Sequence, residues 1–521
     1  MRTFFEKHPV LGVLVLFFAA AVPVLAMRDF TPDNELRYLS IADEALSGGR
    51  FFVLTNHGIP YSDKPPLYFW LVMLLRVILG KHSMFALGML SFLPACGIIV
   101  LMDRWIGSAV QGGLRAPERA AAAAMLAGTG LFAGLAVFLR MDMLMTLFIL
   151  LALYSFEKDR PWGFAVFTFL ALFTKGPVGL LIPLLGVALR CAVLRDGKAA
   201  GRFLGWRFWA VLAAGCAFWF GGVLLEGGKA YLEDLLFHQT YGRAVHASSH
   251  NGPFWLYFVL IWAILAPNCL LSVPSTIGAL RPQDGRSETE AFLAQTALLT
   301  ILMLSCFSSK LLIYLAPLIP ICVYLVPAVL RRREWTSLRA WALRIPAILF
   351  IAIGIAAIAV PLGLRRIPLL AKFDFLGSPL VACCGVAALA GGVAALAVAG
   401  RGWEKPTVRL AAATAAFLFF AGLLVPQINR YTGLGDICSQ VPANEKVYTL
   451  RVRRTDNIDV YLGYGPERAY ERDVDAFLED MPADGVLLVK DSALRERADL
   501  SGVLATKREI GRSGPFILYQ L

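Results

Sequence analysis

The sequence predicts a polytopic α-helical membrane protein with about thirteen transmembrane helices, juxtamembrane helices at the outer face, and a small C-terminal α/β domain. Three observations predict this fold class. Of the 521 residues, 58% are hydrophobic and 17% are charged, and the mean hydropathy is +0.65. Apolar runs long enough to cross a bilayer, which takes roughly 20 residues, recur along most of the chain. Lys and Arg cluster between these runs as orientation signals do, so the net charge of +12 does not indicate nucleic-acid binding.

The number of spans follows from the basic clusters. Fourteen apolar stretches can be marked, and if all of them span, the cluster of Arg104, Arg115 and Arg119 falls on the outer side. If the short stretch 67–80 lies at the outer surface instead, every inner loop becomes basic, as the positive-inside rule expects. The sequence therefore predicts thirteen spans with the N-terminus inside. They are 9–26, 84–102, 120–138, 141–156, 161–174, 177–194, 206–226, 254–273, 289–306, 311–330, 343–363, 379–399 and 409–425.

The first apolar run, 9–26, fits a retained helix or a signal peptide, because "VLAM" is a passable cleavage site. The retained helix is favoured, since the loop assignment needs it. Eight of the nine cysteines lie inside apolar stretches and are expected to be small buried hydrophobic residues. Their spacing indicates neither a disulfide framework nor a zinc site.

The segment "PYSDKPPLYFW" places a charge pair and two prolines immediately before an apolar run. Pro65 and Pro66 suit the first turn of a helix, where no backbone N–H is missed. The apolar run that follows, 67–80, is short for a span. The sequence therefore predicts a re-entrant or interfacial helix with Asp63 and Lys64 at its mouth, on the outer membrane face.

The character of the chain changes after about residue 430. The strand-like segments "KVYTLRV", "IDVYLGY", "GVLLVK" and "PFILYQL" alternate with the helix-like segments "DVDAFLEDM" and "SALRERADL". Alternating strands and helices favour a small α/β domain. We expect a transmembrane domain over 1–430 and an α/β domain over 431–521 on the outer side.

Ionisable residues gather on the predicted outer side, in loops 27–66, 139–142 and 227–253. Asp142 and Lys175 stand out, because they interrupt the apolar sequences "VFLRMDMLMTLFIL" and "LALFTKGPVGLLIP". Ionisable groups near membrane depth are costly and tend to mark function, although outer loops are also polar simply because they are wet. Several cations at one membrane face could hold a phosphate, and nearby carboxylates could act as a general base or bind a metal. This pattern favours an enzyme that uses a lipid-phosphate donor.

Several motifs resemble one family. The segments "NELRYLSIADEALSGGRF", "NHGIPYSDKPPLYFWL", "LRMDMLMTLFILLAL", "TKGPVGLLIP", "HQTYGRAV" and "SSKLLIYLAPLIP" are similar to the aminoarabinose lipid A transferases, integral-membrane glycosyltransferases related to the protein O-mannosyltransferases. The likeness runs in order through about residues 30–330. It implies an inverting enzyme of the bacterial inner membrane with its C-terminal domain in the periplasm. The implied donor is an undecaprenyl-phosphate-linked sugar, and the implied acceptor is lipid A or lipopolysaccharide at the periplasmic face.

The resemblance also implies roles for individual residues. Asp142 matches a catalytic aspartate, and Asp63 and His238 match positions that bind a divalent metal, with zinc favoured. The residues implied around the donor phosphate are Arg37, Lys64, Lys175, Arg243, Lys310 and Tyr314.

The chain departs from the family at the first-loop acidic position. Alignment on "ExRY" puts Asn34, an amide without a basic oxygen, where the family has an aspartate. Asp33 could replace it through a one-residue insertion and is favoured over Glu35 as the catalytic carboxylate. If neither reaches the site, a phosphate acceptor, which is already an anion, would not need a base.

Two other functions remain open. A transporter or flippase for lipid-linked sugars would favour internal repeats and polar sites near the bilayer midplane, whereas the ionisable residues here gather at one face. A protein O-mannosyltransferase-like enzyme with a peptide hydroxyl acceptor is a nearer alternative.

Overall fold

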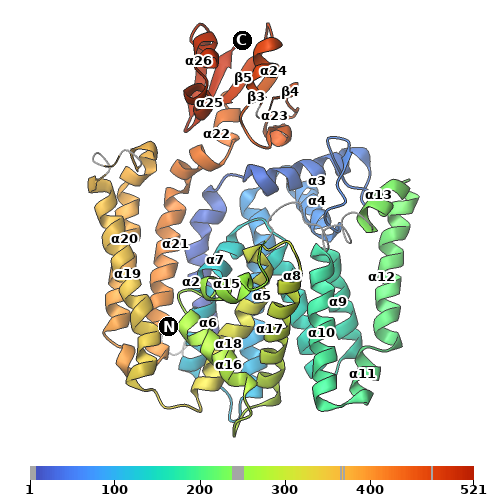
Figure 1. Ribbon diagram of the computed structural model, residues 1–521, viewed down its shortest axis with the longest axis vertical. Helices are drawn as coiled ribbons and strands as arrows, with labels where there is room; N and C mark the ends of the chain where they lie inside the picture. The colour runs from blue at the N-terminus through green and yellow to red at the C-terminus, as the bar shows by residue number, and fades with distance from the viewer. Residues whose placement is uncertain (1–7, 237–251, 364–366, 368–369, 471–472) are drawn as a thin grey trace.

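The computed structural model describes residues 8–236, 252–363, 367, 370–470 and 473–521, and it consists of a helical bundle with a smaller α/β unit at one end (Figure 1). The bundle contains α2 (Pro9–Met27), α3 (Arg37–Gly48), α4 (Leu67–Leu79), α5 (Met84–Ala109), α6 (Ala116–Ala127), α7 (Gly130–Val137), α8 (Asp142–Glu157), α9 (Pro161–Lys175), α10 (Pro177–Leu194), α11 (Gly197–Phe203), α12 (Trp206–Leu225), α13 (Lys229–Glu233), α15 (Leu256–Ile264), α16 (Cys269–Leu280), α17 (Glu288–Cys306), α18 (Leu318–Leu330), α19 (Ser337–Gly363), α20 (Pro379–Leu396) and α21 (Glu404–Thr432).

The bundle has the composition of a membrane domain. Among the described residues, eight helices are long and apolar enough to span, or nine if the bent pair α6 and α7 forms one span. Four shorter apolar helices, α4, α9, α16 and α18, accompany them. The polytopic helical membrane fold is thus confirmed, whereas the count of thirteen spans stays a prediction.

Loops predicted on the inner side contact one another. The guanidinium of Arg331 donates to the carbonyl oxygen of Gly113, and that of Arg115 lies 3.3 Å from the Glu404 carboxylate. Figure 1 shows α11, which lies within the predicted inner connection between spans 177–194 and 206–226, at the end of the bundle opposite the C-terminal unit. The basic clusters that set the predicted topology therefore meet across the bundle.

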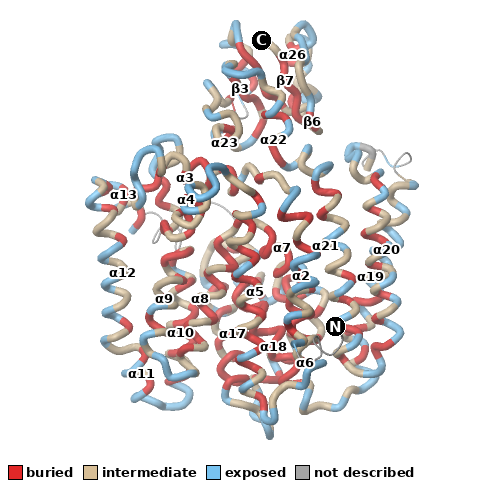
Figure 2. Tube along the Cα trace, turned by 180° about the vertical axis from the view of Figure 1, so that it is seen from behind, coloured by how far each residue is buried: buried red, intermediate tan, exposed pale blue. Residues whose placement is uncertain are grey.

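Helices α3 and α4 lie at the other end of the bundle, beneath the C-terminal unit (Figures 1 and 2). Helix α4 begins directly after Pro66 and ends where Gly80 adopts a left-handed backbone, φ 69°. It buries Phe69 against Tyr38 of α3, with the ring centroids 5.3 Å apart, while Val77 and Ile78 stay exposed. The helix predicted over 67–80 is present as α4, and its re-entrant or interfacial position at the membrane stays a prediction.

The C-terminal unit is a five-stranded sheet with the order β4-β3-β5-β7-β6. Its strands are β3 (Val447–Leu450), β4 (Arg468–Ala469), β5 (Val486–Lys490), β6 (Arg508–Ser513) and β7 (Phe516–Gln520), and its helices are α22 (Gly435–Cys438), α23 (Asp459–Leu462), α24 (Val474–Glu479), α25 (Asp491–Glu496) and α26 (Ala498–Leu504). Strand β5 pairs in parallel with β3 and antiparallel with β7. The small α/β region is thus confirmed, and the boundary at 430/431 stays a prediction.

Strand β5 is apolar on both faces, because both faces are covered. Leu487 and Val489 pack with Phe477 of α24 and with α26. Val486 and Leu488 belong to a core that also contains Leu36, at the end of the first outer loop's π-helix η1 (Pro32–Leu36). The sheet therefore shares a hydrophobic core with the outer end of the membrane domain.

One predicted strand is wrong. The segment "IDVYLGY" at 458–464 forms α23, which ends where Gly463 takes a left-handed backbone, φ 80°. Its Asp459 accepts a 2.8 Å hydrogen bond from Ser40 of α3. Docking on α3 thus overrides the alternating pattern, since local propensity yields to tertiary contacts. Strands β4 and β6 were not predicted, because neither carries a strong apolar pattern.

Candidate active site

The outer end of the bundle holds a buried carboxylate between two cations. Asp142, the first residue of α8, is 1% exposed, and its carboxylate forms an ion pair with the Nζ of Lys175, the last residue of α9. The Nε of Arg140 lies 3.3 Å from the other carboxylate oxygen. An anion at a helix N-terminus and a cation at a helix C-terminus both suit the helix dipole. This arrangement keeps Asp142 ionised, because a buried carboxylate is stable only when paired.

Arg140 was not among the predicted site residues, although it stands two positions before Asp142. The hydroxyl of Ser91 on α5 accepts a hydrogen bond from the Arg140 backbone N–H, at 3.2 Å, and donates one to its carbonyl oxygen, at 2.9 Å. The Arg140 side chain is 30% exposed. Its backbone is therefore fixed, while part of its guanidinium remains accessible.

Tyr38 of α3 links this group to the first outer loop. Burial raises the pKa of Tyr38 to about 12, and its hydroxyl feels the charges of Arg140, Asp142, Arg37 and Asp63. The charges of these four groups therefore act on one buried hydroxyl. We give the name outer cluster to Arg37, Tyr38, Asp63, Arg140, Asp142, Lys175 and Tyr314, together with Lys64, the chain neighbour of Asp63.

Arg37 is the member of the outer cluster with an unsatisfied donor. Its Nη2 donates to the Asn34 amide oxygen at 3.3 Å, and its guanidinium carbon lies 5.2 Å from the Tyr61 ring centroid. Its Nε is buried and finds no hydrogen-bond partner in the described part of the chain. A buried guanidinium N–H without an acceptor is costly, and an anion such as a phosphate would satisfy it.

Lys64 and Asp63 are half-buried just before α4 begins. The outer cluster then contains four cations (Arg37, Lys64, Arg140 and Lys175) and two carboxylates (Asp63 and Asp142), a formal excess of two positive charges. Tyr314 lies in the 3₁₀ turn η3 (Leu312–Leu315), and the Lys175 Nζ is 5.3 Å from its ring centroid. An excess of cations around a partly buried site favours an anionic ligand.

Lys310 has a different set of contacts. Its ammonium donates to the carbonyl oxygens of Ser305 and Phe307, at 2.9 and 2.5 Å, and lies 5.5 Å from the Tyr257 ring centroid. A cation on the last carbonyls of a helix stabilises that end. The structure thus gives Lys310 a role at the end of α17, and its predicted contact with the donor phosphate stays a prediction.

The two candidate first-loop carboxylates lie in different surroundings. Asp33 is 56% exposed, and its carboxylate is 3.2 Å from the Nε of Arg453 in the C-terminal unit. Glu35 is 1% exposed and forms a double hydrogen bond with Arg28, at 2.6 and 2.7 Å. Which residue takes the first-loop acidic position stays open among Asp33, Glu35 and Asn34.

Part of the predicted site lies outside the described residues. These are His238, one of the two candidate metal ligands, and Arg243, one of the candidate phosphate ligands. Within the described ranges, no group of three or more His, Cys, Asp or Glu side chains could hold a metal ion. Asp63 supplies a carboxylate that suits zinc, so the metal stays a proposal that rests on Asp63 and His238.

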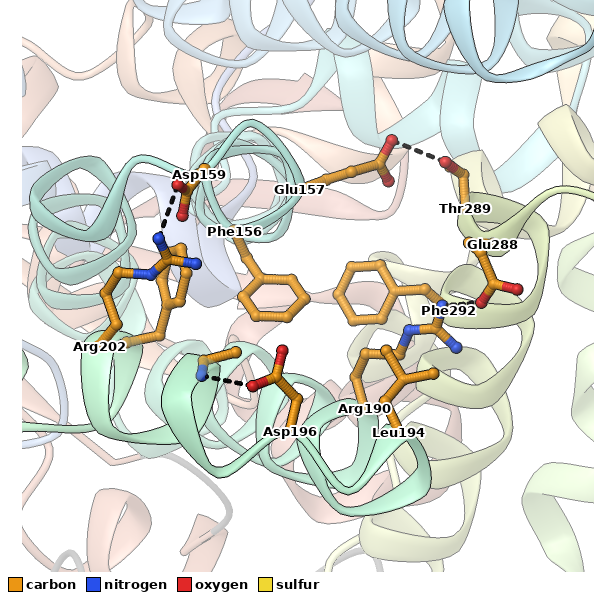
Figure 3. A pocket seen from close by; sticks show the side chains of 12 residues that line it. Phe156, Glu157, Asp159, Arg190, Leu194, Asp196, Arg202, Glu288, Thr289 and Phe292 are labelled. Carbon is orange, nitrogen blue, oxygen red and sulfur yellow. Dashed lines mark hydrogen bonds and ion pairs between the residues drawn. The ribbon is translucent and has the colours of Figure 1, made fainter.

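A cavity of about 280 Å³, lined in part by residues of α11 (Figure 3), lies at the end of the bundle opposite α3 and α4 (Figure 1). Phe156 and Phe292 line its centre, Arg190 pairs with Glu288, and Arg202 with Asp159. Its arginines are thus neutralised by neighbouring carboxylates, and it shares no residue with the outer cluster.

The fold and the outer cluster define a class: a multi-pass membrane protein with a group of ionisable residues, in formal excess of positive charge, at one end of its helical bundle. Comparison with known proteins narrows this class. No protein-family model matches the chain. The chain is 26% identical over 382 residues to undecaprenyl phosphate-alpha-4-amino-4-deoxy-L-arabinose arabinosyl transferase 2 of Pseudomonas fluorescens, a match that covers 69% of this chain and 62% of that protein. It is 23% identical over 386 residues to the corresponding transferase of Shewanella sediminis, covering 69% and 67% of the two chains.

The solved structures extend the likeness to the whole chain. The crystal structure of ArnT from Cupriavidus metallidurans bound to undecaprenyl phosphate matches with a TM-score of 0.73 and 19% identity, covering 100% of this chain and 98% of that one. Its apo form matches with a TM-score of 0.72. The chain therefore has the ArnT-like fold, and the resemblance predicted from the motifs is confirmed. The match spans less than two thirds of the Pseudomonas fluorescens relative, 62% of its length.

Proposed function

We propose that the chain is a membrane glycosyltransferase that moves a sugar from an undecaprenyl-phosphate-linked donor to an acceptor at the outer membrane face. The observation that supports this most directly is the buried, unsatisfied Nε of Arg37 within a group of cations. The names of the relatives, arabinosyl transferases that use an undecaprenyl phosphate sugar, agree with it. The residues of the outer cluster lie together at one end of the bundle, which suits chemistry on a membrane-anchored donor.

In this proposal the donor phosphate binds to Arg37 and Lys64, with Arg243 as a third cation. The glycosidic bond breaks between the anomeric carbon and the phosphate oxygen, so negative charge develops on the departing lipid phosphate. Cations that are already in place stabilise this charge without reorganisation. A metal held by Asp63 and His238 would neutralise part of the same charge.

Asp142 is the proposed catalytic carboxylate. Its ion pairs with Lys175 and Arg140 keep it ionised and fixed, so it can orient the acceptor and stabilise positive charge at the anomeric carbon. Inversion at that carbon follows from attack on the face opposite the phosphate. Asp33 remains the proposed base if the acceptor is a hydroxyl group.

The proposed acceptor is a lipid A or lipopolysaccharide molecule, and the proposed location is the bacterial inner membrane with the C-terminal unit in the periplasm. The alternative acceptor is a peptide hydroxyl, as in an O-mannosyltransferase-like enzyme. A glycosyltransferase and a flippase for lipid-linked sugars predict different products, so an assay with defined substrates separates them.

The test is sugar transfer by the purified protein in detergent. Radiolabelled undecaprenyl-phospho-sugars are supplied with either lipid A or a serine-containing peptide, and Asp142→Asn and Lys64→Ala are assayed beside the wild type. Lys158→Ala is the control, because Lys158 lies on a predicted inner loop and stacks on Tyr154, 5.4 Å from the ring centroid. Transfer that the first two variants lose and the control keeps would support the proposal. Donor movement across vesicles without transfer to either acceptor would overturn it.

A further inference from the structure

Glu35 is the most fully hydrogen-bonded carboxylate at the outer end of the bundle. Its Oε1 accepts from the Arg28 Nη2 at 2.7 Å and from the Leu139 backbone N–H at 2.8 Å. Its Oε2 accepts from the Arg28 Nη1 at 2.6 Å and from the Thr31 backbone N–H at 2.8 Å. A carboxylate has about four acceptor positions, so these four donors use all of them. Glu35 has no acceptor position left for a substrate proton.

Arg28, the partner of Glu35, contacts the residues that precede Leu139. The Arg28 Nη2 lies 3.4 Å from the Val137 carbonyl oxygen, and the Arg28 guanidinium carbon lies 4.4 Å from the Phe138 ring centroid. Arg28 and Glu35 thus contact three consecutive residues, Val137 to Leu139, which precede Arg140 directly. We name the pair of Arg28 and Glu35 the buried clamp. It holds the segment 137–139.

The segment that the clamp holds joins α7 to α8. Phe138 and Leu139 have no helical hydrogen bonds of their own, because α7 ends at Val137 and α8 begins at Asp142. The Leu139 N–H is satisfied by the Glu35 side chain, and the Arg140 backbone by Ser91. Two side chains from distant parts of the sequence therefore set the position of Arg140 and Asp142.

We propose that Glu35 is a positioning residue and not the catalytic base: with Arg28 it fixes the 137–141 connection and thereby the Arg140 and Asp142 side chains in the outer cluster. This inference rests on the proposed function, because it assigns a role to Asp142 in sugar transfer. The acidic residue of "NELRY", Glu35, would then act by holding the reacting groups in place. A displacement of about 1 Å at a reacting group can reduce the rate by about 100-fold.

Two substitutions at Glu35 distinguish positioning from base catalysis. Glu35→Gln keeps the side-chain length and an acceptor for the Leu139 N–H, whereas Glu35→Asp keeps a basic carboxylate but is one methylene shorter. Positioning predicts that Gln retains more transfer activity than Asp, with kcat reduced about tenfold by Gln and about 100-fold by Asp. It also predicts an unchanged shape of the pH profile in the Gln variant, since no group that titrates in the reaction is lost. Higher activity in Asp than in Gln would overturn the inference.

A third variant leaves Glu35 untouched. Arg28→Lys keeps the positive charge but cannot donate two parallel hydrogen bonds, so it loosens the clamp while the Glu35 carboxylate stays available. Positioning predicts a loss of kcat of about tenfold with little change in KM for the donor. Wild-type kcat in this variant would contradict the inference.

A readout that is independent of activity is hydrogen exchange of a peptide that covers residues 137–145. The Leu139 amide loses its acceptor when the clamp opens, so it should exchange faster in Glu35→Asp and Arg28→Lys. The matched control is Asp103→Asn, which breaks another buried ion pair, Asp103 with Arg119, between α5 and α6. The control should not change exchange in this peptide. Equal exchange in all variants would overturn the inference.

The activity of the wild type distinguishes failure of the proposed function from failure of the positioning role. If it transfers no sugar to any acceptor, the proposed function fails, and the exchange experiment still decides whether the clamp holds the connection. If it transfers sugar and Glu35→Asp remains the more active variant, only the positioning role fails.

Discussion

Asp33 and Arg453 form an ion pair, 3.2 Å from Oδ1 to Nε, that joins the first outer loop to the C-terminal unit. Both side chains are mainly exposed, at 56% and 76%. Exposed pairs of this kind contribute roughly 0–1 kcal/mol. The carboxylate that the sequence favours as the catalytic base therefore has a weak partner outside the outer cluster, whereas Asp142 is buried between two cations.

This difference predicts unequal effects of removing the two charges. With a phosphate acceptor, which is already an anion and needs no base, Asp33→Asn should change kcat by less than about threefold, because the exposed ion pair that it breaks also contributes little. Asp142→Asn should reduce kcat by about 100-fold or more, since it removes a preorganised charge from the site. Transfer assays under saturating donor measure both. A loss of similar size in Asp33→Asn would show that Asp33 reaches the reacting groups.

Tyr38 provides a second prediction. Because burial raises its pKa to about 12, the hydroxyl stays neutral at every pH below that value and can only donate or accept as a hydroxyl. Tyr38→Phe should lower kcat/KM by about tenfold, because it removes a neutral hydroxyl that could donate to an anionic ligand, and a hydrogen bond to a charged group contributes about 1.5–3 kcal/mol. The pH profile between 6 and 9 should keep its shape. A shifted basic limb in this variant would contradict a neutral role for Tyr38.

The surroundings of Asp459 predict how pH affects the docking of α23 of the C-terminal unit on α3. Burial raises its pKa, opposed by the hydrogen bond from Ser40 and by the charge of His57, while Asp43 also raises it. A carboxyl whose pKa is higher in the folded state binds its proton more tightly there. Its contribution to stability is therefore complete below its ordinary pKa and is lost as pH rises through the raised value.

Asp459→Asn should remove this pH dependence, because the amide stays neutral and can still accept from Ser40. The measurement is hydrogen exchange of α23 between pH 4 and pH 8. The wild type should lose protection with rising pH and the variant should not. Protection that increases with pH in the wild type would have the opposite sign and contradict the assignment.

Close packing of α9 against α10 at Gly179 leads to a further prediction. A Cβ on Gly179 would lie 2.3 Å from the carbonyl oxygen of Ala171, so the two helices would have to separate. Gly179→Ala should destabilise the protein by about 1–3 kcal/mol, the usual cost of overpacking, and lower its thermal midpoint. Gly134→Ala is the control, since a Cβ at Gly134 meets nothing within 4 Å. Equal thermal midpoints for the two variants would contradict the close packing.

Much of the fold could be predicted from local properties of the sequence. The apolar runs predicted the helical membrane domain, and the two prolines before 67–80 predicted where α4 begins. Strands β3, β5 and β7 were predicted because each is strongly apolar. The segment 458–464 was predicted incorrectly, since its helix depends on docking against Ser40, a contact 419 residues away along the chain.

In the candidate site, too, local sequence patterns could not reveal contacts between distant parts of the chain. Asp142 and Lys175 could be selected because each interrupts an apolar run, and the structure pairs them. Arg140 interrupts the same apolar run as Asp142 but was not chosen as a site residue. Ser91 could not be selected in this way, because it is linked to the site only by a backbone contact between α5 and the 137–141 connection. Glu35 was selected as a possible base from its residue type alone. Its four hydrogen-bond donors belong to Arg28, Thr31 and Leu139, and Leu139 is 104 residues away along the chain, so no local pattern reveals that contact.

We propose that the outer cluster binds the phosphate of an undecaprenyl-phosphate-linked donor. The affinity of the purified protein for undecaprenyl phosphate measures this binding most directly. Arg37→Gln should weaken binding by at least about tenfold, because it removes a charge-assisted hydrogen bond to the phosphate. Arg104→Gln, on a predicted inner loop, serves as the control and should bind as the wild type does. Equal affinity in Arg37→Gln and the wild type would contradict the claim.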